Sequence, residues 1–364
     1  MKYKRTKPAY DINKSWDYNY DHGPRFNGSK HLHETVKARW EFFGKKLISP
    51  LGIAAGPLPN ALWIKAYAEL GYGSLTQKTV RSISHHAHPA PNILLVDIKG
   101  KLSLNSAEPL VAHPEINKPD HEITITNSFG NPSRAPDVWR KETQKALKTL
   151  QAGQILGVNV YGSKFEDMSL DDLADDYGKT AKMAKDAGAE FIEANLACPN
   201  VEGFEDPFLY KNKVAVAAVV RAIKTKIGNT PLLLKMGYFD DFDGLIEVLE
   251  FAKGYFEGIS AINTISRKIV DKKGQMALPR REVSGVCGYA IKPFGIDMAK
   301  KLVAARKQLK LTYEIIGVGG VMLPKDVLDY LRVGVNHVHS ATAVMWNPYL
   351  AQELNLYLKK NTLL

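Results

Sequence analysis

The sequence predicts an α/β protein, a closed (β/α)8 TIM barrel with an N-terminal extension and long active-site insertions. From Leu51 onward, short apolar runs alternate with longer amphipathic stretches, as in repeated strand–helix units around a parallel sheet. Eight runs and eight stretches are present, which favours a closed barrel over an open doubly wound sheet. The length of 364 residues suits one such barrel with insertions.

The short apolar runs predict the strands of the barrel. They cover residues 51–55, 74–78, 155–160, 190–195, 231–236, 259–263, 313–317 and 336–340. The stretches between them carry apolar residues three to four positions apart, which is the period of an amphipathic helix. The predicted helices cover residues 61–70, 136–150, 169–187, 213–227, 242–254, 292–307, 324–332 and 346–360.

Three segments do not follow the strand–helix repeat. Residues 1–48 precede the barrel, and we expect them to form a surface wrap or a partner contact. Residues 81–122 and 265–290 interrupt the repeat after the second and sixth strands. Long loops in compact domains are usually functional, so we expect these two insertions, the second lid-like, to form walls or lids over the active face. The expected organisation is an extension at 1–48 and one barrel domain at 49–364.

The composition is that of a soluble globular protein, with 45% hydrophobic and 24% charged residues. We expect no membrane span, because no apolar run reaches about 18 residues. The basic and polar start lacks the apolar centre of a signal peptide, so a cytoplasmic location is expected. The net charge of +11 is spread along the chain and interleaved with acidic residues. That pattern argues against a nucleic-acid partner and suits an anionic cofactor or substrate.

The two cysteines, Cys198 and Cys287, provide neither a disulfide framework nor the four thiolates of an iron–sulfur cluster. Any cluster would therefore belong to another chain. Glycines surround Cys287, which we expect to pack as a small side chain. The histidines at 85, 86 and 88 have no cysteine or carboxylate at ligand spacing, so no metal site is expected.

Polar side chains recur where the predicted strands end, which in a barrel of this kind is the catalytic face. They are Lys78, Asn159, Asn195, Lys235, Asn263 and Thr264, and Asn127 joins them where the first insertion returns to the barrel. Buried lysine is rare and asparagine is depleted in strands. Each of these residues alone could be a surface lysine or a turn asparagine, but together they predict a polar site. A lysine beside an electron-accepting heterocycle would stabilise the negative charge that develops on reduction.

The most informative motif is EANLACPN at residues 193–200, which places two amides around one thiol. Asn195 and Asn200 could hold a planar, amide-rich ring while Cys198 takes or gives a proton beside it. A lone cysteine is more often a small buried hydrophobe. Here Pro199 cannot pair in a central strand, so Cys198 is expected just past a strand end, where loops carry chemistry.

Glycines at the ends of other strands predict a site for a flat, phosphate-bearing ligand. Ala55 and Gly56 are small enough for a ring to approach the backbone. The run IIGVGGV ends in Gly319 and Gly320, at the position in the strand order where such barrels bind phosphate. Ala341 and Thr342 follow the last strand, and the loop at Gly285 adds another glycine that can approach a phosphate tail.

These motifs resemble the dihydroorotate dehydrogenases, and more widely the flavin barrels that include the pyrimidine-reducing domain of dihydropyrimidine dehydrogenase. The resemblance covers roughly residues 50–360 and rests on GIAAG, LTQKT, TNSFGNP, EANLACPNV, LLLK, INT, SGVCGYAIKP and IIGVGGV. It implies an FMN enzyme of pyrimidine biosynthesis that oxidises dihydroorotate to orotate, with hydride passing to flavin N5. A cysteine base is typical of the soluble class 1 branch.

The resemblance also implies roles for individual residues. Cys198 would be the base, and Lys78 would lie beside flavin and substrate. The substrate ring would be bound by Asn127, Asn195, Asn200, Asn263 and Thr264. The flavin would be contacted by Ala55, Gly56, Lys78, Asn159 and Lys235, and its phosphate surrounded by Gly285, Gly319, Gly320, Ala341 and Thr342.

Some residues depart from the class 1 pattern and keep alternatives open. Ala197 stands where that motif usually has serine, and the insertion at 81–122 is longer than in the family. The run GPLP at 56–59 is closer to dihydropyrimidine dehydrogenase, so an FMN enzyme acting on uracil- or thymine-type rings is the alternative. A subunit that binds flavin or nucleotide and serves mainly as a scaffold is the third hypothesis. The electron acceptor stays open among fumarate, oxygen, quinone and a partner reductase, and a homodimer is expected on general grounds.

Overall fold

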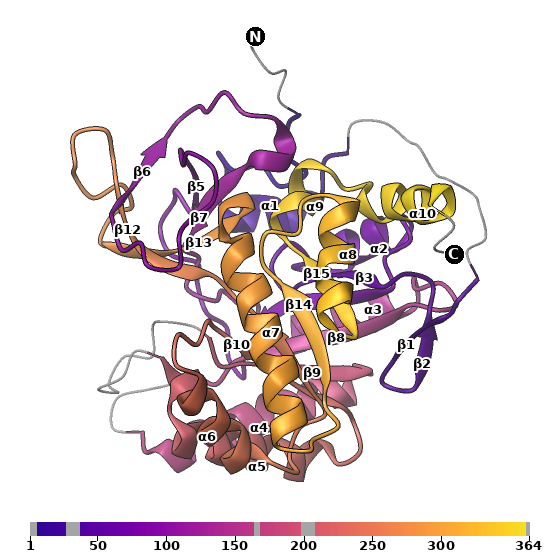
Figure 1. Cartoon of the computed structure of the whole chain (residues 1–364). Helices are drawn as coiled ribbons and strands as arrows, with labels where there is room; N and C mark the ends of the chain where they lie inside the picture. Colours follow the sequence, from indigo (N-terminus) through magenta and orange to yellow (C-terminus); the bar gives the residue numbers. More distant parts are fainter. Residues whose placement is uncertain (1–5, 27–36, 164–167, 198–207, 362–364) are drawn as a thin grey trace.

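The centre of the structure, a computed structural model that describes residues 6–26, 37–163, 168–197 and 208–361, is a closed barrel of eight parallel strands (Figure 1). Around the barrel the strands run in the order β3-β4-β8-β9-β10-β11-β14-β15. Their bounds are β3 (Leu51–Ile53), β4 (Ser74–Val80), β8 (Ile155–Val160), β9 (Phe191–Asn195), β10 (Leu232–Met236), β11 (Gly258–Ala261), β14 (Glu314–Val318) and β15 (His337–Ser340). The predicted (β/α)8 fold is confirmed, and each predicted strand overlaps an observed one.

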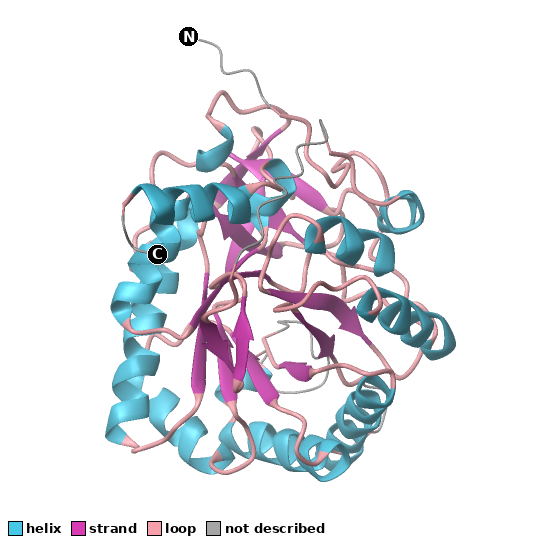
Figure 2. Cartoon of the chain, turned by 90° about the vertical axis from the view of Figure 1, so that its right-hand side faces the viewer, coloured by secondary structure: helices cyan, strands magenta, loops and turns pink. Residues whose placement is uncertain are grey.

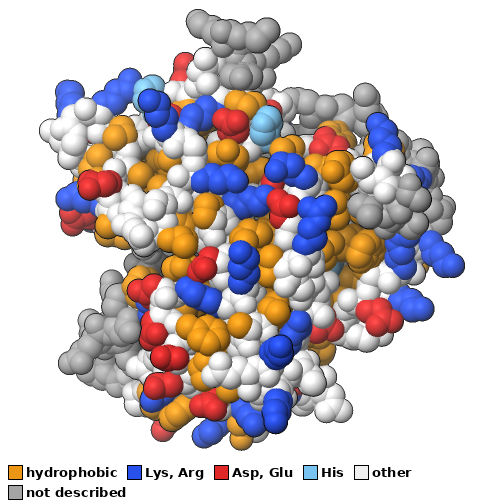
Figure 3. Space-filling model, in the orientation of Figure 1, with side chains coloured by type: hydrophobic (Ala, Val, Ile, Leu, Met, Phe, Trp, Pro, Cys, Tyr) orange, Lys and Arg blue, Asp and Glu red, His pale blue; other side chains and the backbone are white. Residues whose placement is uncertain are grey.

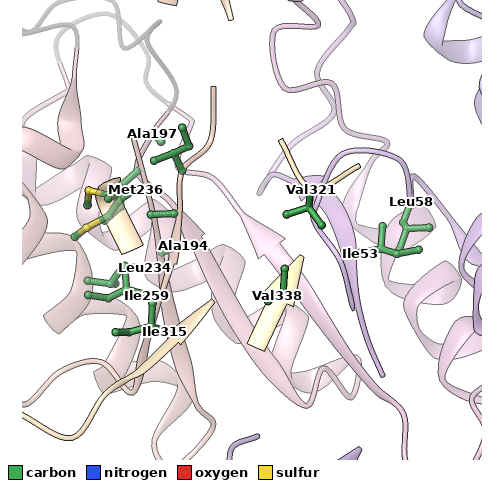
Figure 4. Packing of buried hydrophobic residues seen from close by; sticks show 14 of the residues in the cluster. Ile53, Leu58, Ala194, Ala197, Leu234, Met236, Ile259, Ile315, Val321 and Val338 are labelled. Carbon is green, nitrogen blue, oxygen red and sulfur yellow. The ribbon is translucent and has the colours of Figure 1, made fainter. Parts of the chain in front are cut away.

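Helices cover the outside of the barrel (Figure 2). They are α2 (Ala61–Ala68), α3 (Pro136–Leu147), α4 (Leu170–Asp186), α5 (Lys213–Ile227), α6 (Phe242–Ala252), α7 (Lys292–Gln308), α8 (Pro324–Val333), α9 (Thr342–Trp346) and α10 (Leu350–Lys360). Alternate strand residues such as Ala194, Leu234 and Met236 belong to the apolar core (Figure 4). Because successive side chains of a strand point to opposite faces, the residues between them face the barrel interior.

The last predicted helix, at 346–360, differs from the structure. Two helices stand in this region, α9 and α10, with Pro348 between them. Proline has no backbone N–H and its ring disfavours a continuous helix at this position. The side chain of Asn347 accepts a hydrogen bond from the Tyr349 N–H at 3.2 Å, which stabilises the break.

The two insertions, together with the segment that directly follows the first of them, form a second, smaller closed sheet that is not among the predicted elements (Figure 1, upper left). Its strands are β5 (Ile93–Val96), β6 (Leu110–His113), β7 (Thr124–Asn127), β12 (Ile265–Val270) and β13 (Val283–Gly288), in the order β12-β13-β7-β5-β6. Pairings such as Gly285 with Asn127 join residues far apart in the chain. Local periodicity carries no signal for such contacts, so these short strands read as loops.

The N-terminal extension contributes to both ends of the barrel. Helix α1 (Trp16–His22) brings Trp16 to the cavity at the C-terminal ends of the strands. The hairpin of β1 (Trp40–Phe42) and β2 (Lys45–Leu47) closes the opposite end. There Phe42 is fully buried, with its ring 4.8 Å from the His337 ring and 6.1 Å from that of Phe191. Three short 3-10 helices complete the secondary structure of the described segments: η1 (Asp120–Glu122), η2 (Leu209–Lys211) and η3 (Tyr289–Ile291).

Two buried histidines lie above Phe42 and the apolar residues packed around it. The Ser74 hydroxyl is 2.7 Å from Nε2 of His337 and 2.8 Å from Nε2 of His339. Burial lowers the pKa of His337 to about 3, and burial also lowers the pKa of His339 well below its usual value. Both imidazoles are therefore neutral at pH 7, and the middle of the barrel carries no charge from them.

Truncation of Phe42, which closes this end of the barrel, should destabilise the fold. We expect Phe42→Ala to lower the free energy of unfolding by about 3–5 kcal/mol, because it removes a fully buried ring and leaves a cavity. Urea-induced unfolding, followed by circular dichroism, measures the change. The control is Val138→Ala on α3, where the side chain is 40% exposed and the expected change is within about 0.5 kcal/mol. Equal unfolding midpoints for Phe42→Ala and the wild type would contradict this role.

The depressed pKa of His337 predicts a loss of stability in acid. His337 has a pKa of 6.5 in the unfolded chain and about 3 in the folded barrel. Between these pH values the unfolded chain binds a proton at His337 and the folded barrel does not. This single group should therefore reduce the free energy of unfolding by about 1.4 kcal/mol per pH unit as the pH falls through that window. Urea titrations at several pH values should give a shallower fall for His337→Asn than for the wild type. Parallel curves would show that His337 does not titrate as described.

Candidate active site

A cavity lies between the C-terminal ends of the barrel strands and the small sheet. The barrel contributes Ala54, Ala55, Gly56, Lys78, Thr79, Asn195, Lys235, Ile262, Asn263, Thr264, Val318, Ala341 and Thr342. The small sheet and its loops contribute Ile93, Ile125, Asn127, Ser128, Phe129, Gly130, Asn131, Val283, Ser284, Gly285 and Cys287. This is the end of the barrel at which (β/α)8 enzymes carry their chemistry.

Most of the residues singled out from the sequence line this cavity. They are Ala55, Gly56, Lys78, Asn127, Asn195, Lys235, Asn263, Thr264, Gly285, Ala341 and Thr342. Asn159 is fully buried just outside the lining, and Gly319 and Gly320 are also outside it. Cys198 and Asn200 lie outside the residues that the structure describes.

The conformation of Gly320 has a packing reason as well as the predicted phosphate role. Its φ of 65° is in the left-handed region that favours glycine. A Cβ at this position would lie 2.5 Å from Cβ of Lys292 and 2.6 Å from its backbone nitrogen. Gly320 therefore lets the loop after β14 pack directly against the first residue of α7.

Lys78 lies near the end of β4, where two other parts of the chain hold it. Its N–H donates to the carbonyl of Leu58 at 2.9 Å, which joins β4 to the loop after β3. Its Nζ is 4.7 Å from the centre of the Phe129 ring, a cation–π distance. Arg81 holds the loop that carries Phe129 by donating to the carbonyls of Asn131 and Gly130 at 3.0 and 3.2 Å. These contacts hold Lys78 at the wall of the cavity.

The small sheet forms the roof of the cavity. Ser284 donates to the carbonyl of Asn127 at 2.9 Å, and the Asn127 amide Nδ2 is 3.2 Å from Sγ of Cys287. Burial raises the pKa of the Cys287 thiol, while hydrogen bonds from Thr342 and Asn127 lower it to a smaller extent. We expected Cys287 to act in packing; it also contacts a predicted substrate-binding amide. In the sequence, the glycines beside Cys287 were the feature that indicated close packing around it.

A chain of hydrogen bonds forms the floor of the cavity. Glu193, fully buried, accepts from Nδ2 of Asn159 at 2.6 Å and lies 3.7 Å from Nζ of Lys235. Thr79 donates to Oδ1 of Asn159 at 2.6 Å and accepts from Nδ2 of Asn195 at 3.4 Å. The floor therefore links the ends of β4, β8, β9 and β10.

The cavity suits a planar ligand that has both donors and acceptors. The Oδ1 atom of Asn195 is buried and has no hydrogen-bond partner among the described residues. Buried polar atoms normally have partners, so this oxygen is suited to a ring N–H of a ligand. A Cβ at Gly56 would meet no atom within 4 Å, which leaves open space beside the backbone for a flat ring. These features fit a flavin together with an amide-bearing heterocycle.

Three aromatic residues of the cavity wall were not predicted. Tyr10 and Trp16 come from the N-terminal extension, and Phe129 from the loop after β7. The Tyr10 and Phe129 rings meet edge to face with centres 5.9 Å apart. The indole N–H of Trp16 is buried without a partner in the described part of the chain. The signal in the sequence was the concentration of aromatic residues in an otherwise polar extension.

The described residues contain no group of three or more histidine, cysteine, aspartate or glutamate side chains that could hold a metal ion. Within the same residues, no helix has the length and apolar character needed to cross a membrane. On the face shown in Figure 3, basic and acidic side chains are interspersed over the surface.

Comparison with known proteins identifies the family. The family model described as dihydroorotate dehydrogenase matches residues 112–361. A dihydroorotate dehydrogenase of Dictyostelium discoideum is 34% identical over 376 aligned positions, which cover 99% of this chain and 100% of the relative.

Two further relatives differ in the electron acceptor that their names give. The catalytic subunit of the NAD(+)-type dihydroorotate dehydrogenase B of Alkaliphilus oremlandii is 30% identical over 49% of this chain and 57% of the relative. A quinone-type dihydroorotate dehydrogenase of Haloarcula marismortui is 25% identical over 86% of this chain and 79% of the relative. The chain has a (β/α)8 barrel, a cavity lined by amides and lysines, and full-length similarity to a dihydroorotate dehydrogenase. It therefore belongs to the dihydroorotate dehydrogenase family, oxidoreductases that act on CH–CH groups.

Proposed function

We propose that this protein oxidises dihydroorotate to orotate with FMN as its cofactor, as a step of pyrimidine biosynthesis. The observation that carries the proposal is the convergence of Lys78, Lys235 and three asparagines on one cavity in a chain of this family. The asparagines are Asn127, Asn195 and Asn263. Amides are suited to a ring that itself contains amide groups, because each can donate and accept.

Bound FMN would accept the hydride at its N5 atom. Beside it, Ala55 and Gly56 would leave room for the flavin ring, and Asn159 and Lys235 would contact its polar edge. The phosphate would be held by the loops at Gly285, Gly319, Gly320, Ala341 and Thr342. The lining position of Lys235 supports this assignment, because an ammonium group stabilises negative charge on a reduced ring.

The protein's own residues would bind the substrate and move its proton. Asn127, Asn195, Asn200, Asn263 and Thr264 would bind the dihydropyrimidine ring, with Lys78 beside substrate and flavin. Cys198 would remove the proton on the carbon next to the one that loses hydride. One hydride and one proton leave the ring, which forms the carbon–carbon double bond of orotate.

The charge around the cavity supports an anionic substrate over a neutral uracil- or thymine-type ring. Lys78 lines the cavity, and the loop at 128–131 is held from outside by Arg81 and by Arg281, which donates to the carbonyl of Ser128 at 2.8 Å. A carboxylate gains more from such a cationic wall than a neutral ring does.

The first test is the reductive half-reaction. Protein purified with FMN and mixed with dihydroorotate without oxygen should lose the flavin absorbance near 450 nm, because the hydride is transferred to the flavin before any acceptor is needed. Dihydrouracil is the comparison ligand, since it has the same ring without the carboxylate. A flavin that stays oxidised with dihydroorotate but bleaches with dihydrouracil would reject this substrate and support the alternative.

The second test addresses the base. Cys198→Ala should retain bound FMN yet reduce it about 10²- to 10⁴-fold more slowly, the usual size of a general-base contribution. Stopped-flow absorbance with saturating dihydroorotate measures the rate. The matched control is Cys287→Ala, the other thiol, which should slow reduction by less than tenfold. Reduction of Cys198→Ala at the wild-type rate would remove Cys198 from this role.

A further inference from the structure

Glu193 is a buried acid to which the proposed reaction assigns no role. It is fully buried in the interior of the barrel, two residues before Asn195 on β9. Its neighbour Ala194 is part of the apolar packing shown in Figure 4, so Glu193 and Asn195 both face the interior. Burial of a carboxylate costs free energy unless a positive charge or hydrogen bonds compensate it. A buried glutamate next to the cavity therefore suggests a specific role.

The charge of Glu193 is compensated by Lys235. The Glu193 Oε1 to Lys235 Nζ distance is 3.7 Å, and Lys235 is 5% exposed. The other carboxylate oxygen, Oε2, is buried and finds no hydrogen-bond partner among the residues described. Lys235 lines the cavity, so this pair connects the interior of the barrel to the position proposed for the flavin. The Glu193 carboxylate therefore holds the Lys235 side chain at this position.

The same carboxylate determines the direction of the hydrogen bonds in the floor. An ionised carboxylate only accepts, so Asn159 must turn its Nδ2 toward Glu193 and its Oδ1 toward Thr79. The Thr79 hydroxyl then donates to Asn159 and accepts from Nδ2 of Asn195. This order leaves Oδ1 of Asn195, the atom without a partner, as an acceptor at the cavity.

We propose that Glu193 is a positioning residue that holds the Lys235 ammonium at the cavity and, through Asn159 and Thr79, turns the oxygen of Asn195 toward the substrate. The inference rests on the proposed function, because it takes the flavin and the dihydropyrimidine to occupy this cavity. It extends that function by assigning the electrostatic state of the site to a residue that touches neither ligand. Two observable properties follow, the affinity of the flavin for an added anion and the affinity of the site for orotate.

Sulfite tests the electrostatic half. Its sulfur lone pair forms a bond to flavin N5, the displaced electron pair leaves negative charge on the ring, and the 450 nm absorbance is lost. In the FMN-loaded protein, Glu193→Gln should weaken sulfite binding about tenfold or more, because Lys235 loses the carboxylate that holds its ammonium at the cavity. Glu193→Asp, which keeps the charge, should recover part of the affinity. Unchanged or tighter sulfite binding by Glu193→Gln would overturn the proposal.

The matched control is Glu314→Gln at the opposite end of the barrel. Glu314 is a partly buried acid, and its Oε1 accepts the Phe43 N–H at 2.7 Å. This variant should bind sulfite like the wild type. An equal loss in Glu193→Gln and Glu314→Gln would indicate a general effect of barrel stability and would overturn the specific role.

Thr79→Val tests the amide chain without changing any charge, and it keeps the proposal testable if Glu193→Gln does not fold. Without the hydroxyl, Asn195 loses the partner that orients it, so orotate should bind about tenfold more weakly while sulfite affinity stays the same. Orotate binding is measured from the perturbation of the flavin spectrum. Wild-type orotate affinity in Thr79→Val would overturn the relay. If dihydroorotate fails to reduce the wild-type flavin, the proposed function falls, whereas the sulfite comparison still decides the role of Glu193.

Discussion

The interaction on which the site depends is the buried ion pair of Glu193 and Lys235. A closed barrel excludes water from its interior, so each charge placed there needs a partner within the barrel. The hairpin that carries Phe42 closes one end, and the neutral His337 and His339 occupy the layer above it. Charge appears in the described floor of the cavity only at the level of Glu193 and Lys235, and Lys235 lines the cavity.

The small sheet lies over the open end of the barrel and forms one side of the cavity. Its strands come from two segments that are far apart in the chain, residues 93–127 and 265–288, and β7 and β13 pair so that Asn127 and Cys287 lie together above the floor. The N-terminal extension completes the wall with Tyr10 and Trp16. Walls from several parts of the chain reduce the contact of the cavity with water, which strengthens the electrostatic interactions within it.

The family and the site geometry agree on the type of chemistry. Similarity along the full length to a dihydroorotate dehydrogenase identifies an oxidoreductase that acts on CH–CH groups, and amide and lysine side chains line the cavity at the catalytic end of the barrel. The names of the relatives give different acceptors, NAD(+) and quinone, while the family is the same. A common oxidation half-reaction is therefore compatible with different routes for reoxidation.

The sequence by itself determined the barrel and most of the cavity lining, because both follow from local patterns: apolar periodicity marks strands and helices, and residues at strand ends of a parallel barrel must meet at one face. Lys78, Asn195 and Lys235 were found in this way, whereas Cys198 and Asn200 stay predictions. Only the tertiary structure decided that the insertions pair as one sheet, that Trp16 reaches the cavity and that Glu193 lies against Lys235. These are contacts between segments distant in the chain, and their energies depend on burial and on distances that no local pattern encodes.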